Sequence, residues 1–264
     1  MMNLIRLLNE LSPWLVAFVI VAAAEIYSIG LMVLSRRRLG STFLSLNNEV
    51  AGFKFAVVGV MYAVLLAFVV IVVWEDYRDT EAAVRNEAKA IVDLHQVSSA
   101  LPDPGGSSIR RHLIAYAKQV RHAEWHAMAH GEASPAAARH LEHLTRALFD
   151  DRPQEIQDLA LYQHALRLLT VINDNRNERL DSSDGSVPAV LWLVMLAGGL
   201  ITLGYPSFFG TSSLTAQILM TAALAALVAL TLFLGLVLDF PLTGQVHISA
   251  APLDQALRQM QPSP

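Results

Sequence analysis

The residue of greatest chemical interest is an acidic side chain inside an apolar run. Glu25 falls in the middle of the stretch from Trp14 to Leu34. A carboxylate at the centre of a membrane helix costs about 2.5–3.5 kcal/mol on insertion scales, against about −0.3 to −0.6 kcal/mol for each Leu, Ile, Val or Phe. The apolar neighbours can therefore carry Glu25 into a bilayer. We expect its side chain to face a water-filled path or another span, or to be neutral and hydrogen-bonded to a neighbouring helix.

A second candidate group begins the next apolar run, which extends from Gly52 to Trp74. Asn47, Asn48 and Glu49 precede this run, where they can cap the helix or contact ions at the mouth of a pore. Small residues then recur at spacings that place them on one helix face: Gly52, Ala56, Gly59, Ala63 and Ala67. A face of this kind lets another helix approach closely, or leaves room beside a pore.

Histidines gather later in the chain. His122, His126 and His130 recur every four residues, and His140 and His143 are three apart. Histidines one helical turn apart can share a metal ion, and histidine also titrates near neutral pH. No H-E-x-x-H sequence or nearby general base accompanies them. We therefore expect a solvated histidine face with no tightly bound metal, and we predict no other cofactor.

Two arginines precede the third apolar run. Arg176 and Arg179 lie close to Asp174 and Glu178. They can anchor the helix at the membrane interface and form local ion pairs. Alternatively, they contact lipid headgroups or anions.

The sequence lacks the residues and motifs that common enzyme mechanisms require. The chain contains no cysteine, no phosphate-binding glycine loop and no nucleophile elbow, so we predict that it is not an enzyme. The net charge of −4 argues against a nucleic-acid partner, because binding a nucleic acid requires a basic face on the protein.

The elements that must position these residues are mostly membrane helices. Only 16% of the residues are charged and the mean hydropathy is +0.42, whereas soluble domains carry about a quarter charged residues. Four apolar runs reach the roughly 20 residues that a spanning helix needs: Trp14–Leu34, Gly52–Trp74, Val187–Tyr205 and Leu214–Leu238. The first run continues past Ala22-Ala23-Ala24, which is untypical of a cleaved signal peptide.

Polar helices fill the interval between the second and third runs. Residues 76–100 extend the second span, and their apolar positions Val84, Ala88, Ile91 and Leu94 are expected to continue contacts between subunits. After a Pro- and Gly-rich loop, Ser107 or Ser108 is expected to cap a helix that Gly131 ends. Ser134 is expected to cap the next helix, and a last one runs from Asp151 to about Leu180.

The predicted fold class is all-α, with four transmembrane helices and a helical extramembrane segment inserted between the second and third. No strand pattern is present. The expected organisation is an interfacial amphipathic helix at 1–13, spans one and two at 14–74, the extramembrane segment at 75–186, spans three and four at 187–238, and a C-terminal tail at 239–264.

Positive charge in short loops predicts the orientation. Arg36, Arg37 and Arg38 follow the first span, so this loop is expected in the cytoplasm. The helical segment then lies on the non-cytoplasmic side of a bacterial inner membrane.

Three stretches resemble the bestrophin-like domain family of bacterial membrane proteins. They are NNEVAGFKFAVVGVMYAVLLAFVVIVVWEDYRDTEAAVRNEA (47–88), NRNERLDSSDGSVPAVLW (175–192) and LDFPLTGQVHISAAPLDQAL (238–257). The last departs from the family, which usually has arginine where this chain has Phe240. The resemblance implies a likeness to bestrophin anion channels: two spans, a helical segment and two spans, assembled around a pore. It also implies a cytoplasmic helical segment, opposite to the orientation that the loop charges favour.

Two functions follow from these features. The first is an oligomeric ion channel or pore, with Glu25, Asn48, Glu49, Gly52, Gly59 and Ala63 as its candidate polar and pore residues. The alternative is a membrane-anchored sensor or scaffold whose helical segment binds a partner or ligand. The expected partners are membrane lipids, further copies of the chain and inorganic ions, with no nucleic acid.

Overall fold

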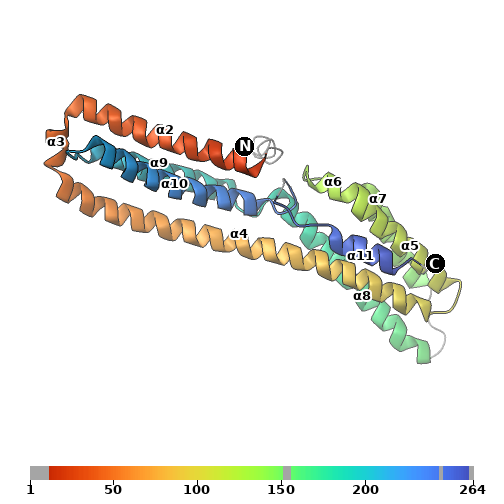
Figure 1. Cartoon of the computed structure of the whole chain (residues 1–264). Helices are drawn as coiled ribbons and strands as arrows, with labels where there is room; N and C mark the ends of the chain where they lie inside the picture. Colours follow the sequence, from red (N-terminus) through yellow and green to blue (C-terminus); the bar gives the residue numbers. More distant parts are fainter. Residues whose placement is uncertain (1–11, 151–155, 244–245, 262–264) are drawn as a thin grey trace. The chain divides into compact units, whose positions relative to one another are not determined.

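The protein is described here by a computed structural model that covers residues 12–150, 156–243 and 246–261 (Figure 1). Every regular element in these ranges is a helix, which confirms the predicted all-α class. The α-helices are α2 (Pro13–Leu39), α3 (Ser41–Ser45), α4 (Asn48–Ser99), α5 (Gly105–Gln119), α6 (Trp125–Met128), α7 (Pro135–Asp150), α8 (Ile156–Asp181), α9 (Ala189–Gly204), α10 (Leu214–Asp239) and α11 (Ala251–Gln259). The π-turn η1 (Val120–Glu124) and the 3-10 turns η2 (Ser182–Asp184) and η3 (Tyr205–Phe208) join some of them.

Four helices are long and apolar enough to cross a membrane, as the sequence predicted. They are α2, α4, the stretch Ala189–Phe208 formed by α9 and η3, and α10. The interfacial helix predicted at 1–13 falls on residues 1–11, outside the described ranges, and on Ser12 and Pro13, where α2 begins.

The chain forms two compact units. Unit 1 comprises Met1–Glu75 and Ser186–Asp239, and unit 2 comprises Asp76–Gly185 and Phe240–Pro264. The long helix α4 contributes to both, because no proline interrupts it between Asn48 and Ser99.

Unit 1 is a bundle of long apolar helices. Helix α2 packs mainly against α10, and also against α9 and η3. On α4, Tyr62 is buried and donates a hydrogen bond to the carbonyl of Met195 at 3.0 Å. A Cβ at Gly198 would lie 2.8 Å from the Tyr62 ring, so this close approach requires glycine.

A buried carboxylate closes the end of unit 1 where α10 finishes. Asp239 is 1% exposed and accepts backbone hydrogen bonds from Ser186 and Val187, both at 2.9 Å. Its other oxygen accepts the indole N–H of Trp192 at 3.0 Å. Asp239 thereby fixes the entry to α9 against the end of α10.

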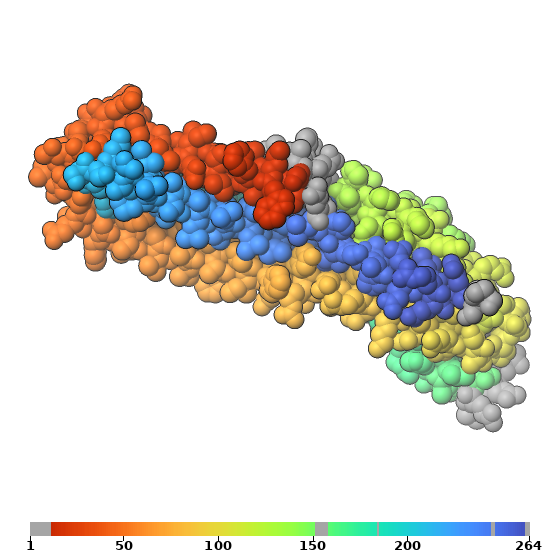
Figure 2. Space-filling view, in the orientation of Figure 1, coloured from red at the N-terminus to blue at the C-terminus, as the bar shows by residue number. Residues whose placement is uncertain are grey.

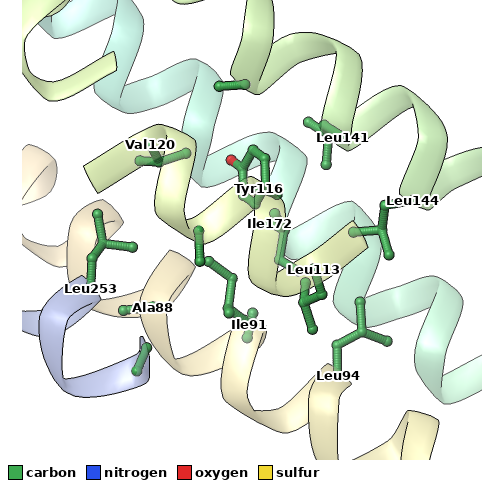
Figure 3. Packing of buried hydrophobic residues seen from close by; sticks show 14 of the residues in the cluster. Ala88, Ile91, Leu94, Leu113, Tyr116, Val120, Leu141, Leu144, Ile172 and Leu253 are labelled. Atoms are coloured by element: carbon green, nitrogen blue, oxygen red, sulfur yellow. The ribbon is translucent and has the colours of Figure 1, made fainter. Parts of the chain in front are cut away.

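Unit 2 has a continuous apolar core (Figure 3). Its buried members include Ile91 and Leu94 of α4, Leu113 of α5, Leu144 of α7 and Ile172 of α8. The C-terminal region, for which the sequence predicted no helix, contains α11, and this helix adds Leu253 and Ala256 to the same core.

The core corrects one prediction about α4. Val84, Ala88, Ile91 and Leu94 do not form contacts between subunits, because all four are buried against helices of this chain. An amphipathic stripe shows that a face is covered, whereas its spacing does not say which helix covers it.

The helix ends in unit 2 follow local chemistry. The start of α5 is held by Asp103, whose carboxylate accepts the Ser107 N–H at 3.0 Å, so the expected serine cap is wrong. Ser134 caps α7 as predicted, because its hydroxyl accepts the Ala137 N–H at 3.4 Å. Gly131 follows α6 with a φ of 72°, a conformation that favours glycine.

Candidate functional site

Most of the small-residue face of α4 is left uncovered by the described residues. Ala56, Ala63 and Ala67 are exposed, and no described atom lies within 4 Å of a Cβ built on Gly59. A Cβ on Gly52 would meet only the Phe209 ring, at 3.9 Å. The face of α4 that packs inward is instead bulky and consists of Tyr62, Leu66, Val69 and Val73.

The polar residues at the start of α4 have different surroundings. The side-chain amide of Asn48 donates to the carbonyl of Gly210 at 2.7 Å and accepts the N–H of Gly210 at 3.0 Å. Asn48 therefore holds the connection between α9 and α10. Glu49 is exposed in the first turn of α4, where the helix dipole favours a carboxylate.

Glu25 is half-buried on α2 and forms no hydrogen bond with any other residue of the described ranges. Its neighbours on α2 do bond to α9: Ser28 donates to the carbonyl of Leu203 at 2.6 Å, and Tyr27 donates to that of Leu200 at 3.2 Å. The chain alone thus leaves the one acidic side chain in the middle of this span without a polar contact from a described residue.

Unit 2 contains a buried cluster of two arginines and two glutamates. The Arg179 guanidinium donates from Nε to Glu87 Oε2 at 2.8 Å and from Nη2 to Glu124 Oε1 at 2.9 Å. Arg176 donates from Nη2 to the other oxygen of Glu124 at 2.7 Å. Tyr116 donates to Glu87 at 2.5 Å. The cluster joins α4, α5, the π-turn and α8, and its charges balance.

Burial makes this cluster sensitive to the loss of any member. Arg179, Glu87 and Glu124 are all 0% exposed. Burial lowers the pKa of Arg179, but the attraction of Glu87 and their hydrogen bond outweigh it, and the net pKa is raised. Trp125 also faces Arg179, with its ring centroid 5.8 Å from Cζ.

The π-turn gives the cluster part of its geometry. Glu124 is the last residue of Val120–Glu124, where the helix winds more widely than an α-helix. Such turns are frequent at functional sites. Here the turn directs Glu124 to two arginines on α8.

The surroundings of Arg176 and Arg179 differ from those that the sequence predicted for them. Their ion-pair partners lie 52 to 92 residues away along the chain, not at Asp174 and Glu178. Arg179 has no exposed surface with which to contact a lipid headgroup or an anion, and Arg176 is 7% exposed. Their observed contacts fix α8 inside unit 2.

A Tyr116→Phe variant is expected to lose about 1.5–3 kcal/mol of stability at neutral pH, because a hydrogen bond to a carboxylate is removed. Burial, followed by the charge of Glu87, raises the pKa of Tyr116 well above 10.0. The folded chain therefore keeps a proton that the unfolded chain releases. This contribution to stability is present below about pH 10 and is lost as the pH rises above that value.

Thermal unfolding of the full chain between about pH 7 and pH 11 would check this, with the half-buried Tyr162→Phe on α8 as control. The variant should lose stability less steeply at alkaline pH than the parent chain. Equal alkaline slopes would contradict the role given to Tyr116.

The predicted histidine face is divided among several elements. His122, His126 and His130 are exposed, and His143 stacks on His112 of α5 with ring centroids 5.5 Å apart. Burial, followed by the charge of His143, lowers the pKa of His112. Among the described residues, no three His, Asp or Glu side chains converge as metal ligands, and the absence of a tightly bound metal stays a prediction.

Sequence reasoning missed Glu87, Glu124, Tyr116 and Asp239. A signal existed for Glu87, which lies three residues after Val84 and four before Ile91, on the apolar face of α4. An acid within a stripe of buried positions requires a buried partner. For the other three, the local pattern carries no comparable mark.

The three stretches that carry the family resemblance meet through these contacts. Glu87 of the first stretch pairs with Arg179 of the second, within unit 2. Trp192 of the second bonds to Asp239 of the third, within unit 1. Phe240, which stands where the family usually has arginine, is 4% exposed.

Comparisons with known proteins agree with this architecture. Structures of a bacterial bestrophin homologue from Klebsiella pneumoniae share the fold. The structure of one mutant of that homologue matches this chain with a TM-score of 0.70 and 12% sequence identity. The match covers 91% of this chain and 97% of the homologue. The structure of a second mutant has a TM-score of 0.70 and 12% sequence identity, and the match covers 92% of this chain and 98% of the homologue. A structure of the homologue solved by Zn-SAD phasing has a TM-score of 0.68 and 12% sequence identity, and the match covers 90% of this chain and 96% of the homologue.

Sequence comparison places the chain in a family. No curated protein matches it significantly over its sequence. The profile of the Bestrophin-like domain, however, matches residues 21–253, which is most of the chain. Together with the four apolar helices, this match identifies a membrane protein. The chain belongs to the Bestrophin-like domain family.

Proposed function

We propose that the protein is one subunit of a homo-oligomeric ion channel in which α4 faces the symmetry axis. The observation that carries this proposal is the small-residue face of α4, which the described residues leave uncovered at Ala56, Gly59 and Ala63. Membrane helices present small residues where another backbone comes close, or where space is needed beside a pore. The fold shared with solved bacterial bestrophin homologues and membership of the Bestrophin-like domain family support a channel as the function.

The polar residues fit a path shared by several copies. Glu25 lacks a hydrogen-bond partner among the described residues, and Glu49 is exposed at the start of α4. Acidic rings of this kind are used by pores that conduct cations, whereas the likeness to bestrophins points to anions. The ion that is conducted therefore has to be measured.

Planar bilayer recording is the direct test. Purified protein in mild detergent should have the mass of an oligomer, and it should produce unitary currents after reconstitution. Ion substitution would then give the selectivity. A stable monomer that passes no ions would overturn the proposal.

A membrane-anchored sensor or scaffold is the second candidate. A groove of about 430 Å³ lies between α4 and α11 in unit 2, with Arg85, Lys89 and Gln255 among its lining residues. Figure 2 shows α11 (dark blue) beside this part of α4 (yellow). A polar groove of this size is within the range of small-molecule sites, roughly 300–1,000 Å³. An oligomer whose axis is closed and filled by lipid would favour this function.

We further propose that the segment at 75–186 lies outside the membrane on the non-cytoplasmic side of a bacterial inner membrane. Arg36, Arg37 and Arg38 close α2 and support a cytoplasmic loop there. A phosphatase fused at Gly105 should be active, and one fused at Gly40 should be silent. The reverse pattern would overturn the orientation and agree with that of bestrophins.

A further inference from the structure

A groove opens in unit 1 near the α9–α10 connection. Its volume is about 320 Å³. One part of its lining is polar, with Asn48, Thr211 and Gln217, whereas Phe55 and Leu224 are among its apolar residues. In Figure 2 the α9–α10 connection (light blue) lies beside α2 and α3 (orange-red) at this end of unit 1.

An arginine with unused donors adjoins the polar part of the groove. Arg36 donates from Nη1 to the carbonyl of Thr211 and to Oε1 of Gln217, both at 2.9 Å. Gln217 is 3% exposed and is itself held by a bond from Nε2 to the carbonyl of Phe209 at 2.6 Å. Both acceptors of Arg36 are neutral, and no described carboxylate forms an ion pair with it.

The contacts leave one edge of the guanidinium available. Nε and Nη2 of Arg36 make no hydrogen bond to a residue in the described ranges. This edge has the fork geometry that matches two phosphate oxygens. Because Nη1 is fixed by two acceptors, the ordering of the guanidinium is largely complete before a ligand arrives.

The surroundings of Arg36 are electropositive. Arg37 and Arg38 follow it in the last turn of α2. The connections at 40–47 and 205–213 contain no acidic residue. The positive dipole end of α10 also lies at this connection, and no acidic residue occupies the first turn of α10. The N-terminus of α4 is tied to Gly210, but Glu49 in its first turn offsets the dipole end of α4.

We infer that this groove binds an anionic phospholipid, with the lipid phosphate at Arg36 and one acyl chain along Phe55, Met220 and Leu224. A charged polar end followed by an apolar wall matches an amphipathic ligand. A free anion would leave the apolar wall without a partner, and a second copy of the chain would need to bring an acid to Arg36. Basic pockets between membrane helices bind anionic headgroups in this way. The site does not depend on whether the protein conducts ions.

Native mass spectrometry of the delipidated full-length protein in mild detergent would test the site. Phosphatidylglycerol should bind, and phosphatidylethanolamine should bind more weakly. Arg36→Gln should weaken phosphatidylglycerol binding about tenfold, because a charge-assisted contact is lost. Arg111→Gln, at an exposed arginine of α5 in unit 2, is the control and should change binding by no more than about twofold.

A second variant tests the acyl-chain contact while leaving the hydrogen bonds at the polar end of the groove intact. Leu224→Trp should fill the groove and weaken lipid binding without altering the Arg36 contacts, provided that elution remains monodisperse. The inference is overturned if Arg36→Gln and Leu224→Trp bind phosphatidylglycerol as the parent does, or if both lipids bind equally. Displacement by inorganic phosphate alone, or a neighbouring copy seated in the groove, would also overturn it.

Discussion

Replacing Arg179 with methionine is expected to destabilise the protein by about 3–5 kcal/mol, the typical cost of removing one partner from a buried ion pair. The variant would leave Glu87 without its bidentate partner, and Arg176 would be the one remaining ion-pair partner of Glu124 among the described residues. Both glutamates are 0% exposed, so water cannot replace the lost contacts.

The measurement is urea-dependent proteolysis of the full chain in mild detergent. Arg85→Met is the matched control, because Arg85 also pairs with a glutamate at 2.8 Å, but the side chains of Arg85 and Glu81 are 55% and 44% exposed. Its loss should cost no more than about 0.5 kcal/mol. Similar losses for the two variants would contradict a dominant role for burial.

A double variant tests whether the cluster acts as a unit. Glu87→Gln combined with Arg179→Met should cost less than the sum of the two single changes, because neither charge is then left alone. Strict additivity would mean that the two side chains contribute independently despite their separation of 2.8 Å.

Ala63→Leu is expected to abolish ion conduction or to break the oligomer. The leucine would project from the small-residue face of α4, where the described residues leave Ala63 exposed. If α4 lines a pore, the added bulk would narrow the pore and favour dewetting. If the face packs against another subunit, the overpacking leucine should cost about 1–3 kcal/mol.

Planar bilayer currents and the mass of the detergent-solubilised oligomer distinguish these two results. Gly59→Leu should behave similarly, since it lies on the same face. Val57→Leu is the control, because Val57 is 48% exposed on another face of α4 at a similar depth. Normal assembly and conduction in both the Ala63 and Gly59 variants would mean that α4 does not face the symmetry axis.

The sequence determined the four apolar helices and several helix ends, although it revealed neither α11 nor the contact of Asp103 at the start of α5. An apolar run of sufficient length must be helical in a membrane, because only a helix satisfies its own backbone hydrogen bonds there. The spans predicted at 187–205 and 214–238 accordingly correspond to α9 and α10. Ser134 and Gly131 act within a few residues of their own positions, and therefore local sequence was enough to predict them.

The tertiary structure alone decided which polar residues meet. Arg179 finds Glu87 92 residues away, and Asp239 finds Trp192 47 residues away. The apolar spacing of Val84 and Ile91 was visible, but the sequence did not show that α5, α7 and α8 cover them. Periodicity reports that a face is buried, whereas its partner depends on the packing of elements that are distant in the chain. Buried charges depend on that packing most strongly, because they are stable only where the fold brings their counter-ions.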